Sequence, residues 1–144
     1  MGLTFEVAGN SKIAVEHEEG TVLVNAIGVS GQGLRPTDYF LAGLGSCMLG
    51  TLIDFAQNQG FDAQGTRLSM SSTTATRPMR LGSIDVTLQF PSTLTSVQVG
   101  QLTRAASRCK IHSTLTVAPE VNVAVEEVPP EKIPADSSFE KAQN

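Results

Sequence analysis

One long segment of helical periodicity, from Pro36 to about Gln59, most restricts how this chain can fold. Its apolar side chains recur every three or four residues in two adjacent rows, which predicts a helix that is buried nearly all round. Pro36 or Thr37 suits the first helical turn, and Gly60 suits the stop. Its internal glycines indicate close approach of another backbone. The two rows are Phe40, Leu44, Cys47, Thr51 and Phe55, and Leu41, Leu44, Met48, Leu52 and Phe55.

Segments that alternate apolar and polar side chains lie on both sides of this helix and predict strands. They are residues 3–7, 13–17, 21–27, 66–76, 81–90 and 121–126. A second helix, capped by Ser92 or Thr93, is expected to run to Cys109. This order predicts an α+β fold with mostly antiparallel strands. We expect one domain over residues 1–128 and a polar, proline-bearing tail over residues 129–144.

The charge balance argues against a nucleic-acid surface. The 144 residues include 10 basic and 14 acidic side chains, for a formal charge of −4. The densest basic group, Arg104, Arg108 and Lys110, is interpreted as a solvated helix face. The longest apolar run, residues 41–55, contains glycines and Asp54, so we expect it to be too short and too polar to span a membrane. A cytoplasmic protein with no membrane or nucleic-acid partner is expected.

The chain has only two cysteines, Cys47 and Cys109. A free cysteine is often a small apolar core residue, and a reactive thiolate needs a cation, a helix N-terminus or hydrogen-bond donors. Cys47 lies about three turns inside its predicted helix, so the dipole of that helix does not activate it. Both interpretations stay open on the residues alone, and a reactive Cys47 would need a basic group from elsewhere in the chain.

The surroundings of both cysteines resemble the OsmC/Ohr family. The run Pro36-Thr-Asp-Tyr-Phe-Leu-Ala-Gly-Leu-Gly-Ser-Cys47 is similar to the family's first-cysteine helix, Pro-x-Glu-Leu-Leu-Leu-Ala-Ala-Leu-Gly-x-Cys. The run Cys109-Lys-Ile-His-Ser-Thr-Leu115 is similar to its second motif, Cys-Pro-Val-Ser-Asn-x-Leu. The similarity is closer to the broad OsmC-like branch than to the dedicated organic hydroperoxide resistance proteins.

This resemblance implies an intertwined homodimer with antiparallel sheets around two long central helices. It also implies a thiol-dependent peroxidase, active against organic hydroperoxides in oxidative-stress defence. Cys47 would be the peroxidatic thiolate and Cys109 the resolving cysteine, and an external dithiol would reduce the resulting disulfide. No cofactor is implied.

The chain departs from the family at the residues that activate the thiolate. The family uses an arginine from the N-terminal strand region and a glutamate near the start of the first-cysteine helix. Here Arg35 is the candidate replacement for that arginine, Thr37 follows Pro36, and Asp38 matches the acidic position of the broader branch. In the second motif Lys110 and His112 replace Pro and Ser, and His112 is either a local base or a structural residue.

Two other functions are considered. A non-enzymatic dimer could bind an apolar ligand or sense oxidants without turnover. A metal site could use Cys47, Cys109, His112 and His17, although zinc sites usually have two close ligand pairs and this chain has one. The chain contains no nucleophile-elbow motif and no Gly-rich phosphate loop.

Overall fold

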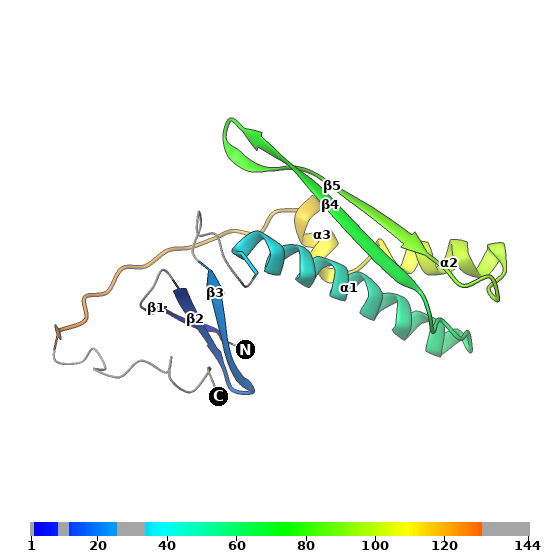
Figure 1. The fold of residues 1–144 in the computed structure, drawn as a ribbon, viewed down its shortest axis with the longest axis horizontal. Helices are drawn as coiled ribbons and strands as arrows, with labels where there is room; N and C mark the ends of the chain where they lie inside the picture. Colours follow the sequence, from blue (N-terminus) through cyan, green and yellow to red (C-terminus); the bar gives the residue numbers. More distant parts are fainter. Residues whose placement is uncertain (1, 9–11, 26–33, 131–144) are drawn as a thin grey trace. The chain divides into compact units, whose positions relative to one another are not determined.

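The computed structural model describes residues 2–8, 12–25 and 34–130, and it shows the expected α+β class (Figure 1). The chain divides into two compact units. One unit is formed by Met1–Phe40 and Val121–Asn144, and the other by Leu41–Glu120. The predicted tail over residues 129–144 lies mostly outside the described residues.

The first unit contains a three-stranded antiparallel meander. Strands β1 (Thr4–Ala8), β2 (Lys12–His17) and β3 (Gly20–Asn25) pair in chain order. This confirms the first three predicted strands. Ala14, in the central strand, is almost fully buried.

Helix α1 (Pro36–Gln59) has the bounds that the periodicity predicts. At its start, the backbone carbonyl of Arg35 accepts the first helical hydrogen bonds. At its end, Gly60 adopts a φ of 74°, and the backbone N–H of Phe61 donates to the carbonyl of Ala56 at 2.8 Å. Only a residue without a Cβ takes this left-handed conformation at no steric cost, so Gly60 fixes the exit of the chain from the helix.

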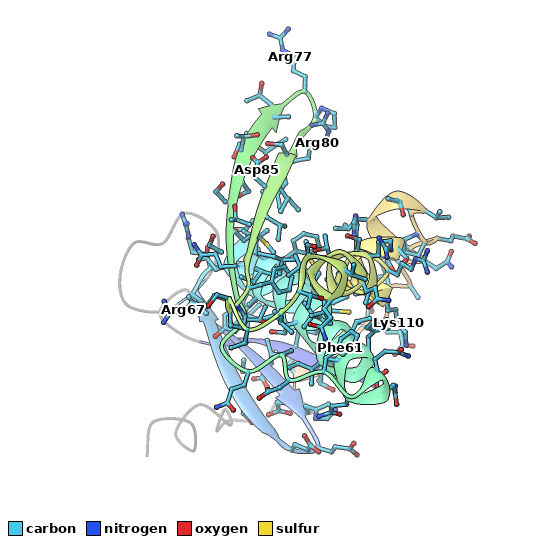
Figure 2. The ribbon with its side chains drawn as sticks, turned by 90° about the vertical axis from the view of Figure 1, so that its right-hand side faces the viewer. Phe61, Arg67, Arg77, Arg80, Asp85 and Lys110 are labelled. Carbon is cyan, nitrogen blue, oxygen red and sulfur yellow. The ribbon has the colours of Figure 1, made fainter. Side chains whose placement is uncertain are left out.

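A long hairpin packs against α1 in the second unit (Figure 1). It consists of β4 (Arg67–Thr76) and β5 (Met79–Gln89), which are antiparallel with an irregularity between Thr73 and Thr74. Arg77 projects from the turn at its tip (Figure 2). A Cβ built on Gly45 of α1 would lie 3.4 Å from Leu68, so this small residue lets the hairpin approach the helix closely.

Two shorter helices complete the second unit. Helix α2 (Ser96–Ala106) begins at a capping box. The Thr95 hydroxyl accepts a hydrogen bond from the backbone N–H of Gln98, and the Gln98 side-chain oxygen accepts one from the backbone N–H of Thr95. The predicted caps, Ser92 and Thr93, were therefore wrong. The capping box satisfies the free backbone N–H groups of Thr95 and Gln98, and this decides where the helix starts.

The core of the second unit forms where α1 meets α2 and Cys109. Its buried members are Leu44, Met48, Leu52, Ala56, Leu102, Ala106 and Cys109. The hairpin covers this cluster with alternate side chains, namely Leu68, Met70, Ile84, Val86 and Leu88. The second predicted row of α1 is thus confirmed as its core face.

Three predictions, on the burial of α1, on its length and polarity, and on a last strand, were wrong. Helix α1 is not buried all round: among the described residues it is buried along one stripe only, since Phe40 and Ile53 are exposed. By length and composition α1 could cross a membrane, contrary to expectation, but its buried stripe packs into the core of the second unit. Residues 121–126 form no strand, and Val121 and Val125 are exposed.

Candidate active site

Cys47 lies on the N-terminal half of α1 and is half-buried. It packs against the edge of the core cluster. The backbone carbonyl of Cys47 accepts a hydrogen bond from the Thr51 hydroxyl, one turn further along the helix, at 2.9 Å. The helical periodicity that buries Leu44 and Met48 on either side of it therefore fixes the direction of the Cys47 side chain.

Cys109 occupies a different local structure from the one expected. Helix α2 ends before it, and Cys109 is the N-cap of helix α3 (Lys110–Thr116), with φ −63° and ψ 153°. Its Sγ accepts a hydrogen bond from the backbone N–H of His112 at 3.3 Å. Its side chain is only 1% exposed. A sulfur in place of the usual capping oxygen joins the buried core to the first turn of α3.

The structure brings the two thiols together, and both are free. The backbone N–H of Ile111 and a hydrogen bond from the Cys109 thiol lower the pKa of Cys47, against the opposing effect of burial. Burial raises the pKa of Cys109, and the neighbouring Cys47 sulfur adds to that effect. Of the two thiols, Cys47 therefore loses its proton more readily than Cys109.

The start of α3 supplies donors that the sequence analysis missed. The backbone N–H of Lys110 and its ammonium group both lower the pKa of Cys47, after the larger effect of Ile111. Lys110, labelled in Figure 2, is the first residue of α3. The signal was present in the second motif, because a proline at this position would have neither a backbone N–H nor a charge. The replacement by lysine adds both.

Arg35 and Asp38 are brought together with each other at the start of α1. The Asp38 carboxylate accepts from the Arg35 backbone N–H at 2.9 Å and from its Nε at 3.2 Å. These bonds, the backbone bond first, lower the pKa of Asp38. Both residues belong to the first unit, whereas both cysteines belong to the second.

The residues of the alternative metal site are also divided. His17 ends β2 in the first unit, where its Nδ1 accepts from the Glu19 backbone at 3.3 Å. Across the described ranges, no three side chains of the His, Cys, Asp or Glu type are grouped so as to hold a metal ion.

A cavity of about 360 Å³ opens beside the C-terminal half of α1, within the second unit. Its lining combines apolar side chains of α1 with the segment that leads to β4, and it includes neither cysteine. Its apolar lining residues are Leu49, Leu52, Ile53, Ala56, Phe61 and Ala63, and its polar ones are Gln57, Asp62, Gln64 and Thr66.

Comparison with known proteins confirms the family. The sequence profile of the OsmC-like proteins matches residues 29–124, more than half of the chain. The fold is similar to that of an OsmC-like protein from Mycoplasma pneumoniae, with a TM-score of 0.72 and 18% identity over 81% of this chain and 87% of that one. The chain belongs to the OsmC-like protein family.

Solved structures with similar folds include proteins with different descriptions. A putative osmotic stress induced and detoxification response protein from Psychrobacter arcticus aligns with a TM-score of 0.70 and 20% identity, over 78% of this chain and 85% of that one. The organic hydroperoxide resistance protein OhrB of Bacillus subtilis aligns with a TM-score of 0.61 and 16% identity, over 82% and 93%. No curated protein matches the chain by sequence.

Proposed function

We propose that this protein is a thiol-dependent peroxidase that reduces organic hydroperoxides. The observation that carries the proposal is the contact between two free thiols whose pKa values are shifted in opposite directions. A peroxidatic cysteine must be a thiolate that a substrate can reach, and Cys47 is half-buried with a lowered pKa. A resolving cysteine must lie beside the peroxidatic cysteine, and Cys109 does so as a buried thiol.

The proposed reaction has three steps. The Cys47 thiolate attacks the distal oxygen of the hydroperoxide, the O–O bond breaks, and the alkoxide leaves as an alcohol after taking up a proton. The Cys109 sulfur then attacks the Cys47 sulfenic acid, which forms the Cys47–Cys109 disulfide and releases water. Two electrons from an external dithiol reduce the disulfide and restore both thiols.

We assign the activation of Cys47 to groups at the start of α3, and a separate role to Arg35 and Asp38. The start of α3 supplies the backbone N–H of Ile111 and the charge of Lys110. Arg35 and Asp38 are assigned to the peroxide site on the motif resemblance, and their ion pair at 3.2 Å gives them a defined geometry in the first unit. In this account the missing N-terminal arginine is replaced by local donors.

We further propose a cytoplasmic homodimer built from residues 1–128. The described chain leaves many large apolar side chains exposed, which a second copy would cover. They include Phe5, Val7, Phe40, Ile53, Met79, Val121, Val123 and Val125. Light scattering on purified protein should give twice the monomer mass. A monomer mass over a wide concentration range would overturn this part of the proposal.

Peroxidase activity is tested directly by the two cysteine variants. Consumption of cumene hydroperoxide with a dithiol reductant should stop in Cys47→Ser. Cys109→Ser should still react once with the peroxide and should hold a sulfenic acid that a cyclic dione probe labels. Wild-type protein that fails to consume the peroxide in excess dithiol would exclude this function.

The cavity favours one alternative, a non-enzymatic ligand-binding or redox-sensing protein. A cavity of about 360 Å³ with a largely apolar lining suits a small apolar ligand. This alternative predicts that a fluorescent fatty-acid analogue binds and that peroxide is not turned over. Leu49→Trp should then reduce the binding of the analogue without changing the reactivity of Cys47.

A further inference from the structure

Lys110 is an exposed cation at the edge of the thiol pair. It is the first residue of α3 and directly follows Cys109, the N-cap of that helix. Lys110 is exposed, whereas Cys109 is buried. The ion pairs formed among the described residues do not include Lys110. A flexible ammonium group that faces solvent without a carboxylate partner can pair with an anion from solution.

The chain around Lys110 is positively charged, although the protein as a whole is acidic. Residues 86–119 contain Arg104, Arg108 and Lys110 but no aspartate or glutamate, whereas the formal charge of the whole chain is −4. All three basic residues are exposed. Acidic neighbours within this segment therefore do not cancel its charge, and anions in solution are attracted to it.

The first turn of α3 packs on α1 next to Cys47. A Cβ built on Gly43, one turn before Cys47, would lie 3.7 Å from the Cδ1 of Ile111, the residue that follows Lys110. The pKa of Cys47 is lowered first by the backbone N–H of Ile111, and the backbone N–H and the charge of Lys110 add to this effect. No carboxylate of the described chain is among the groups that act on this thiol. Lys110 is therefore the charged side chain that acts on the Cys47 sulfur.

A cation at this position has two separable consequences. By stabilising the thiolate, it speeds the reaction of Cys47 with every electrophile, whatever the charge of that electrophile. By attracting anions, it speeds only the reactions of electrophiles that carry a negative charge. The second effect matters because a carboxylate on the substrate and the thiolate repel each other, and the ammonium group offsets this repulsion.

We propose that Lys110 gives Cys47 a preference for substrates that carry a carboxylate. Within the peroxidase cycle, on which this substrate class rests, the favoured substrates are organic hydroperoxides with a carboxylate on the same molecule. The bonds that form and break are those of the proposed reaction, in which the Cys47 thiolate takes the distal oxygen and the alcohol leaves. Lys110 takes no part in these bond changes and acts as a specificity-determining residue.

Two alkylating reagents of different charge test this preference without any peroxide. Iodoacetate and iodoacetamide both react with the Cys47 thiolate and release iodide, so the ratio of their rates does not depend on how much of the thiol is ionised. In a Cys109→Ser background Cys47 is the only thiol. There, Lys110→Gln should lower the ratio of the iodoacetate rate to the iodoacetamide rate by about two- to fivefold. Lys110→Arg keeps the charge and should keep the ratio.

A matched control separates the position of the charge from the net charge. Arg80 is exposed on β5, away from Lys110 (Figure 2), and is not among the groups that act on Cys47, so Arg80→Gln should leave the ratio unchanged. With Lys110 present, the ratio should also fall at an ionic strength of about 1 M, where the Debye length is about 3 Å. A ratio that stays the same in Lys110→Gln, or that falls equally in Arg80→Gln, would overturn the inference.

Hydroperoxides test the substrate class and separate this inference from the peroxidase proposal. The kcat/KM for cumene hydroperoxide that bears a ring carboxylate, divided by the kcat/KM for cumene hydroperoxide itself, should fall in Lys110→Gln. A protein that consumes both hydroperoxides but shows no effect of Lys110 on either ratio would contradict the role of Lys110 alone. A protein that consumes neither hydroperoxide but whose alkylation ratio depends on Lys110 would contradict the peroxidase and support charge selection at Cys47.

Discussion

The buried sulfur of Cys109 and the half-buried sulfur of Cys47 interact across the junction of α3 and α1. One is held by the N-cap position of a short helix, and the other by the core face of a long one. The two sulfurs differ in burial and in the backbone donors that reach them. These differences give two chemically identical side chains opposite protonation preferences.

The reactivity of Cys47 should depend on the side chain at position 109. Because the Cys109 thiol donates a hydrogen bond to it, Cys109→Ala should raise the pKa of Cys47, whereas Cys109→Ser keeps a donor and should change it less. The measurement is the rate of alkylation by iodoacetamide as a function of pH. Identical pH profiles for the two variants would show that this hydrogen bond does not act on Cys47.

Cys109 should make the fold less stable at alkaline pH. Burial raises its pKa, so its contribution to stability is complete below the ordinary thiol pKa of about 8.5 and is lost as the pH rises through the raised value. In a Cys47→Ser background, urea unfolding should show a free energy that falls as the pH rises above about 8.5. Adding Cys109→Val should remove part of this fall. Parallel profiles with and without Cys109 would contradict the assignment.

Leu102 should be a major contributor to the stability of the second unit. It is fully buried on α2 in the core cluster that also contains side chains of α1, so Leu102→Ala should lower the free energy of unfolding by about 2–5 kcal/mol. Val97, on the same helix, is 68% exposed, and Val97→Ala should cost less than about 0.5 kcal/mol. Urea denaturation compares the two. Similar losses at both positions would mean that another surface covers Val97.

The capping box should make Thr95 the residue on which the start of α2 depends. Thr95→Ala removes the acceptor of the Gln98 N–H and should cost about 1 kcal/mol. Thr95→Ser keeps this acceptor and should be nearly neutral. Ser92→Ala is the matched control, since Ser92 takes no part in the box. A larger loss of stability in Ser92→Ala than in Thr95→Ala would support Ser92 as the N-cap, as the sequence had predicted.

The sequence predicted those parts of the fold whose signals are local. Both ends of α1 and the alternation of β5 follow from periodicity and from Gly60, and both agree with the structure. The cap of α2 was missed because several neighbouring residues, Ser92, Thr93 and Thr95, offer a hydroxyl. Only the reciprocal bond with Gln98 separates them.

For the candidate site, the sequence predicts which two cysteines take part but not what surrounds them. The motifs identified Cys47 and Cys109, yet the placement of Cys109 as the cap of α3 depends on where α2 ends and on the packing of Leu102 and Ala106. The N–H of Ile111 that lowers the pKa of Cys47 is a backbone group, so the amino-acid type at that position does not predict it. The exposure of residues 121–126 likewise contradicts an alternation that favours a strand.

The central claim is that the two thiols form a couple, and one measurement tests it most directly. Reduced protein is treated with one equivalent of cumene hydroperoxide, and its free thiols and intact mass are determined, followed by peptide mapping. The account predicts the loss of both thiols, a mass decrease of two hydrogen atoms and a Cys47–Cys109 linked peptide. Two thiols that persist at unchanged mass after prolonged excess peroxide would contradict it.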